Sequence, residues 1–593
     1  MSQRKNDDWM GTPLPRKEDR RLLTGKGKYV SDIVIPGALH AVFVRSEYAH
    51  AKILSIDTSE AEELAGVERI YTGDQIKHLI KSMPQPIVQP ALPAHYPTFW
   101  PLAVDKVTFH GEPVALVIAR DKYVAEDAAE LVFVDYEELE PVLDPEEALK
   151  PESAIIHEKD GTNEIFSMTF TGGDTQASQA ENAAEVEKIF QNAPIVVKDR
   201  FKTHRTGVTP MEPRAILCDW DDSDGLLAYI TTQRPHIDRL ALSDILDISA
   251  EKVQVIAPRD QGGGFGVKAP FYRENIIIAH AARDLKQPVR WVESRYESLM
   301  NVGQERDQIN DMEIAADLEG NMLALRNFGL ADNGVGTTGV YWGFVMPFLG
   351  AIELPNGYKW PKADIRLKVA TTNKACLTPS RAFGHFPTRF AIERCIDMVA
   401  HKIGMEPSTF RRKNLVADLP YTSITNEYFD SGDFLKVWDT LMEKANLPDF
   451  RVQQKNALSE GKYIGIGFGC GVELSGVASE LFVPMENQPG YGAATVRLDP
   501  RGKVQVFGGD APGGQGHETT TAQVVASEFG ISPEDVIITT GNTGSTPFGS
   551  GSVGARMGSY FISAVAEACR ELKTKIAKFL AHDLQLEASV EHF

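Results

Sequence analysis

Three glycine-rich loops contain the residues best suited to bind a charged ligand. They are residues 261–268 (QGGGFGVK, the first glycine loop), 512–521 (PGGQGHETTT, the second) and 548–556 (FGSGSVGAR, the third). Glycine lets the backbone approach a ligand closely, and a helix N-terminus directs unpaired amide groups at an anion. Any one of these loops is equally well explained as a tight turn. The second and third together favour a cradle for an extended ligand that carries a pyrophosphate.

Other common ligand-binding patterns are absent from the sequence. The first glycine loop is neither GxGxxG nor followed by a Lys-Ser/Thr pair, so the two familiar nucleotide loops do not fit. There is no HExxH motif, and Gly516-His517-Glu518 is too compact to place two ligands on one metal. The five cysteines form no CxxC pair, which argues against an iron–sulfur or zinc site and favours reduced, buried thiols. We therefore expect no metal bound directly by protein side chains, and any metal to arrive inside an organic cofactor.

The elements that position these loops are predicted to mix strands and helices, which indicates an α+β protein. Residues 39–44 and 113–119 are typical of strands. Residues 389–403 form an amphipathic helix that Gly404 ends. A second long helix is expected over residues 558–581, and its apolar stripe is more typical of a core than of a cofactor contact.

Length and charge narrow the function further. A chain of 593 residues suggests about four structural units. The net charge of -21 makes nucleic acid an unlikely partner because acidic surfaces repel phosphate backbones. No apolar run approaches the roughly 20 residues of a membrane span, and the first residues lack a secretory signal. We expect a cytoplasmic protein without a membrane span.

An ordered set of short motifs resembles the molybdopterin-binding large subunits of the molybdenum hydroxylase family, which includes xanthine dehydrogenase, aldehyde oxidase and carbon monoxide dehydrogenase. The resemblance runs from about residue 11 to the C-terminus. Besides the three glycine loops, its motifs are residues 20–29 (RRLLTGKGKY), 36–41 (PGALHA), 44–46 (VRS), 49–51 (AHA), 211–214 (MEPR), 231–236 (TTQRPH) and 372–374 (TNK).

The resemblance implies a fold and, together with the polar, Gly/Ala-rich composition of residues 172–186 (GGDTQASQAENAAEV), which is typical of a linker, it indicates a division of the chain. The fold would be an N-terminal a/b hammerhead-like domain followed by molybdopterin-binding α+β domains. The expected limits are 1–165 for the hammerhead-like domain, 166–187 for a linker, 188–445 for the first molybdopterin-binding domain and 446–593 for the first part of a second, incomplete one.

The resemblance also implies a molybdopterin cofactor that carries molybdenum, in the cytosine dinucleotide form. Gln233 matches a glutamine that hydrogen-bonds an oxo ligand of molybdenum, although a strand-end amide satisfied by backbone is the alternative. The first glycine loop would lie beneath the metal, and the other two would hold the pterin and dinucleotide. The implied cofactor-binding residues are Gln233, Gly263, Gly264, Phe265, Gly266, Arg381, Ala382, Gly514, Gln515, Gly516, His517, Thr519, Thr520, Gly551, Ser552, Gly554 and Arg556.

Residues 378–387 (TPSRAFGHFP) match the active-site loop of the family. The implied catalytic residues are Gln233, Arg381 and Phe383, with Arg381 beside molybdenum unless it makes a structural ion pair. A guanidinium suits negative charge on a substrate, and the Phe383 ring suits a planar substrate. His385 is either a substrate hydrogen-bonding group or a structural residue.

Two departures from the family pattern narrow the substrate. Carbon monoxide dehydrogenases carry a copper-binding cysteine where this chain has Ala382, and purine-oxidising members carry a glutamate where it has Ala269. Carbon monoxide and xanthine are therefore poor substrate candidates. We expect Phe383, His385 and Ala269 to face the substrate.

The Gly-Val-Gly-Glu loop that carries the catalytic glutamate of the family does not occur in these 593 residues. We expect either a split large subunit, with a second molybdopterin-binding chain supplying the C-terminal part, or a fragment. The resemblance also implies an FAD-binding subunit and an iron–sulfur subunit.

Three functions remain open from the sequence. The first is a hydroxylase or dehydrogenase that inserts a water-derived oxygen at an electron-poor carbon of an aldehyde or N-heteroaromatic compound. The second is a redox-neutral hydratase on the same scaffold. The third is a non-catalytic cofactor-scaffold subunit.

Overall fold

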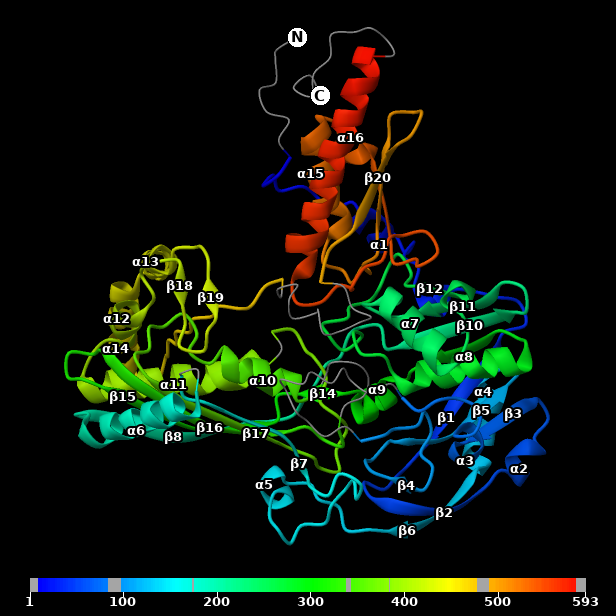
Figure 1. Cartoon of the computed structure of the whole chain (residues 1–593), viewed down its shortest axis with the longest axis horizontal. Coiled ribbons are helices and arrows are strands. Elements are labelled where there is room, and N and C mark those ends of the chain that lie inside the picture. Colours follow the sequence, from blue (N-terminus) through cyan, green and yellow to red (C-terminus); the bar gives the residue numbers. More distant parts are fainter. Residues whose placement is uncertain are drawn as a thin grey trace.

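A computed structural model describes residues 9–83, 97–172, 175–336, 343–382, 384–476 and 490–582. Two sheets lie at opposite ends of the molecule, and a third unit that ends in a long helix stands above the region between them (Figure 1). Helices and strands are mixed along the chain, so the predicted α+β class is confirmed. None of the helices in the described ranges is both long and apolar enough to cross a bilayer.

A seven-stranded sheet combines strands that are far apart in the sequence. Its β1 pairs with β13 in parallel, so the sheet joins strands from both sides of the predicted domain limit at residue 165. The strands predicted at 39–44 and 113–119 are confirmed as β1 and β5. In order across the sheet the strands are β12 (Val253–Ile256), β11 (Gly225–Ile230), β10 (Ala215–Asp221), β13 (Val289–Val292), β1 (Leu39–Arg45), β5 (Pro113–Ala119) and β3 (Val67–Thr72).

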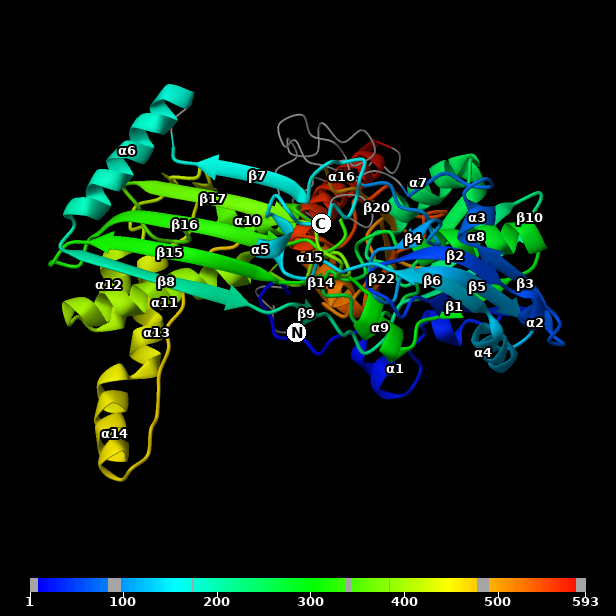
Figure 2. The same ribbon diagram turned by 90° about the horizontal axis from the view of Figure 1, so that it is seen from below.

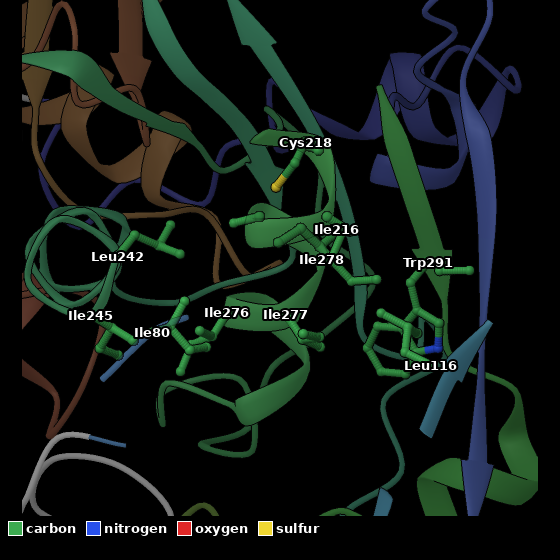
Figure 3. Packing of buried hydrophobic residues seen from close by; sticks show 14 of the residues in the cluster. Ile80, Leu116, Ile216, Cys218, Leu242, Ile245, Ile276, Ile277, Ile278 and Trp291 are labelled. Carbon is green, nitrogen blue, oxygen red and sulfur yellow. The ribbon is translucent and has the colours of Figure 1, made fainter. Parts of the chain in front are cut away.

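Helix α8 (Arg273–Leu285) buries an unbroken apolar run against this sheet. Ile276, Ile277 and Ile278 are all fully buried, which a helix shows when protein surrounds it. Figure 3 shows these side chains between those of helix α7 (Pro235–Ile245) on one side and of the sheet on the other. This packing fixes α8, whose N-terminus follows the first glycine loop.

A five-stranded sheet forms the other end of the molecule, and its strands lie side by side in Figure 2. Helix α11 (His385–Ile403) covers one face and contains the predicted helix 389–403, which Gly404 ends at φ 81°. Helix α6 (Gln176–Asn192) packs on the other face. The strands, in sheet order, are β7 (Glu164–Phe170), β17 (Ala363–Ala370), β16 (Met322–Asp332), β15 (Gln308–Ala316) and β8 (Ile195–Thr203).

The segment predicted as a linker, 166–187, forms secondary structure. It contains most of β7 and the first part of α6, which is capped where the Thr175 hydroxyl accepts from the amide of Ser178. Its composition is polar because α6 lies on the outside of the sheet and buries little more than Val186 and its neighbours. The linker prediction is wrong because a mostly exposed helix has the composition of a loop.

The C-terminal unit is a three-stranded sheet covered by two helices. Its strands are β20 (Ala494–Leu498), β21 (Val504–Gly508) and β22 (Val536–Thr540). Helix α15 (His517–Phe529) follows the second glycine loop, and α16 (Ile562–His582) continues a π-helical turn, Met557–Phe561. These last two segments confirm the helix expected over residues 558–581.

The remaining elements are short or lie at the edges. Helices α13 and α14 form a hairpin that projects from the five-stranded part (Figure 2). The other helices are α1 (Asp19–Leu23), α2 (Ser59–Glu62), α3 (Gly73–Ile76), α4 (Lys122–Leu131), α5 (Pro145–Ala148), α9 (Arg295–Asn301), α10 (Val345–Ile352), α12 (Pro407–Asn414), α13 (Phe434–Ala445) and α14 (Leu447–Ser459). The other strands are β2 (Ala51–Asp57), β4 (Lys106–Val107), β6 (Phe133–Glu138), β9 (Thr206–Gly207), β14 (Gln304–Glu305), β18 (Tyr421–Thr422) and β19 (Tyr428–Phe429).

Candidate cofactor site

The side chain of Gln233 joins the first and third glycine loops. It is buried between the end of β11 and the start of α7. Its Oε1 accepts a hydrogen bond from the amide of Gly266 at 2.9 Å, and its Nε2 donates to the carbonyl of Ser552 at 2.7 Å. This matches the alternative of a backbone-satisfied amide, although a carboxamide nitrogen carries a second hydrogen that is available to a ligand.

The first glycine loop also packs against the active-site loop. A Cβ at Gly266 would lie 2.5 Å from the carbonyl oxygen of Pro379, and one at Gly264 would lie 2.6 Å from Oε1 of Gln233. Glycine is therefore required at position 266, where φ is 106° and the clash is with backbone, whereas a side chain at position 264 would displace the Gln233 carboxamide. Gly263 adjoins them, and a Cβ there would meet the Phe265 ring at 2.7 Å.

Strained backbone marks the same region. Phe265, Ala382 and Ala555 have φ values of 55°, 59° and 55°, in the left-handed region that residues other than Gly, Asn and Asp rarely adopt. Each lies in one of the loops predicted from the sequence. Such strain persists where the surrounding structure imposes it, and it is concentrated at functional sites. The Phe265 side chain is 49% exposed, so it is accessible to a ligand.

The third glycine loop packs on the residues that lead directly into the second. The Ser552 hydroxyl donates to the carbonyl of Ala511 at 2.5 Å, and the buried carboxyl of Asp510 accepts from the backbone of Gly551. Gly551 is held closely, because a Cβ there would lie 2.7 Å from the carbonyl of Gln233. The structure therefore brings all three loops and the base of the active-site loop into one cluster.

The second glycine loop has one side open to a ligand. Gly514 has φ 86°, is exposed, and an added Cβ there would meet nothing within 4 Å. Gln515 and Thr520 are also exposed, and Gly516 directly precedes α15. Burial lowers the pKa of His517 to about 4, so its imidazole is neutral at physiological pH.

Three predicted cofactor residues make contacts within the protein. The Thr519 hydroxyl donates to Glu18 at 2.7 Å and accepts from the amide of Lys17, so the N-terminal segment occupies it. Arg556 donates to the carbonyls of Gly476 and Gly490 at 2.7 and 2.9 Å, and the amide of Gly476 donates to Gly554. Gly554 and Arg556 therefore support the third loop from behind.

The active-site loop presents Arg381 to solvent. Its side chain is exposed and makes no ion pair with any side chain that the structure describes. The structural ion pair considered above is therefore not formed within those ranges. Phe383 lies outside the described residues. Ala269 is only 2% exposed, and its amide donates to the carbonyl of Gly266, which places it behind the first glycine loop.

His385 is buried against charged side chains of its own surroundings. Its Nδ1 contacts the Glu353 carboxylate, and Arg389 lies 3.1 Å from the same nitrogen. Burial lowers the pKa of His385 to about 3 and raises that of Glu353 to about 8, so the neutral forms of both groups are favoured. This geometry supports the structural alternative for His385.

Two supporting groups were not predicted from the sequence. Glu212 accepts from the amide of Gly262 at 2.8 Å and from the ammonium of Lys268 at 3.0 Å, and the Lys268 side chain is fully buried. This pair pins both ends of the first glycine loop. In the sequence, only the 211–214 motif pointed to a role for Glu212. The second group is the N-terminal strap, residues 9–29, whose contacts with α15 cross about 500 residues of sequence.

The residues of the cluster fit a large anionic cofactor. Polar atoms in the first and second loops are buried without a hydrogen-bond partner among the described residues, namely Gln261 Oε1, His517 Nδ1 and Thr521 Oγ1. Buried polar atoms in native proteins almost always have partners, so these are available to a ligand. Within the described ranges, no group of three or more His, Cys, Asp or Glu side chains could hold a metal ion.

Comparison with known protein families identifies three domains in the chain. Residues 24–140 match the aldehyde oxidase and xanthine dehydrogenase a/b hammerhead domain. Residues 156–415 and 440–592 each match a molybdopterin cofactor-binding domain. The fold and the cluster of loops thus define a molybdopterin-binding protein.

Individual relatives identify the family. The chain is 34% identical to the nicotine 6-hydroxylase large subunit of Paenarthrobacter nicotinovorans, over 98% of this chain and 70% of that one. It is 34% identical to the carbon monoxide dehydrogenase large chain of Afipia carboxidovorans, over 98% and 73%. The quinoline 2-oxidoreductase structure from Pseudomonas putida 86 matches with a TM-score of 0.89 and 31% identity, covering 99% of this chain and 73% of that one.

The chain belongs to the molybdenum hydroxylase family, as the resemblance implied. It is a molybdopterin-binding catalytic subunit of the multi-subunit oxidoreductases in that family. The subunit names of its relatives imply other subunits in the complex.

Proposed function

We propose that this subunit hydroxylates an N-heteroaromatic compound at an electron-poor ring carbon, with the new oxygen coming from water. The observation that carries the proposal is the cluster in which Gln233 joins two glycine loops while exposed Arg381 stands on the loop packed against Gly266. The names of the relatives that act on nicotine and quinoline support this substrate class. An aldehyde is the alternative substrate of the same chemistry.

The residues of the chain have separable tasks in this reaction. When bound, the molybdenum cofactor supplies the activation of water and the two-electron oxidation. Gln233 fixes the geometry of the first loop, and its remaining N–H is available to the cofactor. The Arg381 guanidinium is placed to stabilise negative charge that develops on the ring, because it is permanently charged and has no carboxylate partner among the described residues.

Two small residues distinguish this site from those of other members. Ala382 offers no thiolate, so a copper-dependent oxidation of carbon monoxide is not supported. Ala269 offers no carboxylate for a purine, and it is buried. Both observations favour a substrate that needs no hydrogen-bonding or metal-binding side chain at these two positions.

We further propose that the cofactor is the cytosine dinucleotide form and that the partners are an FAD-binding and an iron–sulfur subunit. The second and third loops support the dinucleotide form, since two adjacent loops at helix N-termini suit an extended ligand with a pyrophosphate. Electrons from the substrate must leave the subunit, and the sequence contains no CxxC pair that suggests a cluster of its own.

The experiment is to purify the native complex and measure its metal, nucleotide and turnover. We expect stoichiometric molybdenum, cytidine monophosphate on acid hydrolysis, and dye reduction with quinoline or nicotine but not with xanthine or carbon monoxide. Turnover by the purified complex in ¹⁸O-labelled water would show whether the oxygen added to the substrate comes from water. Product formation without dye reduction would instead show a hydratase, and a metal-free complex with intact partners would show a scaffold.

A further inference from the structure

Strand β14 lies directly beside the base of the active-site loop. The amide of Gln304 donates to Cys376 at 3.1 Å, and the amide of Thr378 donates to Gln304 at 2.9 Å. The strand also pairs with β9. Backbone hydrogen bonds thus tie β14 to the base of the loop and to β9, and they place Glu305, its last residue, and the following Arg306 beside the loop.

Glu305 closes the loop from one side. Its Oε1 accepts from the amide of Gly384 at 3.0 Å, and its carboxyl also accepts from the backbone of Ser380. These two amides flank Arg381 and Ala382. The Glu305 side chain is 2% exposed, so water does not compete for the bonds. A single buried carboxylate therefore draws together both ends of the segment that carries Arg381.

Arg306 also contacts this loop. Its Nη2 lies 3.3 Å from both the Ser380 hydroxyl and the carbonyl of Arg381, and its guanidinium lies 4.2 Å from the centre of the Phe386 ring. Successive side chains of a strand normally point to opposite faces. Arg306 has φ 74°, which interrupts that alternation and lets two consecutive side chains reach one loop.

We propose that Glu305 and Arg306 are positioning residues that hold the active-site loop in the conformation that presents Arg381 to the substrate. The inference rests on the proposed function, because that function supplies the substrate that Arg381 is to contact. The pair contacts none of the three glycine loops in its hydrogen bonds. Losing the pair therefore acts first on the active-site loop, and through it on substrate binding, while the hydrogen bonds that join the glycine loops through Gln233 stay in place.

The test uses the purified complex with its partner subunits, at pH 8.5. Burial raises the pKa of Glu305 to about 7, so this pH keeps its carboxylate ionised. The variants are Glu305→Gln, Glu305→Ala and Arg306→Met. The matched control is Glu313→Gln, which removes a mostly buried carboxylate, 11% exposed, from β15 where it pairs with Lys198 and Arg326.

The first readout is amide hydrogen exchange in peptides that cover residues 376–390. We expect Glu305→Ala to speed exchange of these peptides at least tenfold, Glu305→Gln and Arg306→Met to speed it less, and the control to leave it unchanged. The second readout is steady-state kinetics with quinoline. We expect the KM to rise about tenfold in Glu305→Ala, with kcat within threefold and molybdenum content unchanged.

Unchanged exchange and unchanged KM in all three variants would overturn the proposal. So would a loss of molybdenum with exchange in 376–390 unaltered, because the pair would then act on the fold and not on the loop. If the wild-type complex does not oxidise quinoline, the substrate class proposed above is wrong, while hydrogen exchange still tests the loop separately.

Discussion

Substituting Gly264 with alanine tests whether Gln233 clamps the first and third glycine loops together. The new Cβ would lie 2.6 Å from Oε1 and 3.1 Å from Cγ of Gln233, so the carboxamide must move. It cannot move and keep its bonds to the amide of Gly266 and the carbonyl of Ser552, at 2.9 and 2.7 Å. The variant therefore breaks both contacts through one methyl group.

The expected cost follows from the two hydrogen bonds. A net contribution of about 1 kcal/mol for each gives about 2 kcal/mol, or roughly a thirtyfold change in an equilibrium constant. We expect the Gly264→Ala complex to lose molybdenum roughly thirtyfold faster than wild type after gel filtration. Metal analysis of samples taken over time measures the rate.

Two further variants decide whether the clamp is the cause. Gly558→Ala is the control, since a Cβ there meets nothing within 4 Å, and it should retain molybdenum like wild type. Gln233→Ala should lose the metal, and adding Gly264→Ala to it should have no further effect, because the clashing group is gone. Full retention of molybdenum in Gly264→Ala, or additive losses in the double variant, would refute the reasoning.

The remaining predictions concern stability. Burial raises the pKa of Asp510 to about 6 in the folded protein. As pH rises from about 4 to about 6 the carboxyl ionises in the unfolded chain before it does so in the folded one, so the free energy of unfolding falls over this range. Asp510→Asn should therefore raise the melting temperature at pH 7.5 but not at pH 4. A lower melting temperature at both values would contradict this. Arg21→Met removes the guanidinium that contacts Asp260 and Glu518 at 2.8 and 2.7 Å. Because Glu518 keeps Arg259 and Asp260 keeps the amide of Lys28, the variant should cost about 2 kcal/mol in urea unfolding. The exposed Arg20→Met should cost nothing measurable, and equal losses in the two variants would argue against the buried network.

The sequence predicts the fold best where an element is well buried. Helix α11 and strand β1 were expected because their apolar spacing has the period of their structure, and β5, which is buried along its whole length, because its apolar run has the length of a strand. Helix α6 was missed because it is largely exposed and its composition resembles a loop. The seven-stranded sheet crosses the expected domain limit because pairing of β1 with β13 spans about 250 residues, which local patterns do not encode.

In the site too, features set by local sequence could be predicted and long-range contacts could not. The glycine loops were predicted because positive φ and close backbone approach restrict the residue type at each position. The partners of those loops could not be predicted, because they are distant in the sequence. Glu18 accepts a hydrogen bond from the Thr519 hydroxyl about 500 residues away, and Glu305 lies about 75 residues from the amides that it binds. Their residue types are common, and only the fold gives them a role.

The contacts of Gln233 and of the N-terminal strap make the cofactor site depend on docking of the C-terminal unit. Gln233 meets Ser552 only when the C-terminal unit has docked, and Arg21 then bridges Asp260 of the first unit to Glu518 of α15. A ligand that contacts loops of both units binds the docked form alone. It must therefore stabilise docking by the free energy of its own binding, so cofactor insertion and assembly of these units are thermodynamically coupled.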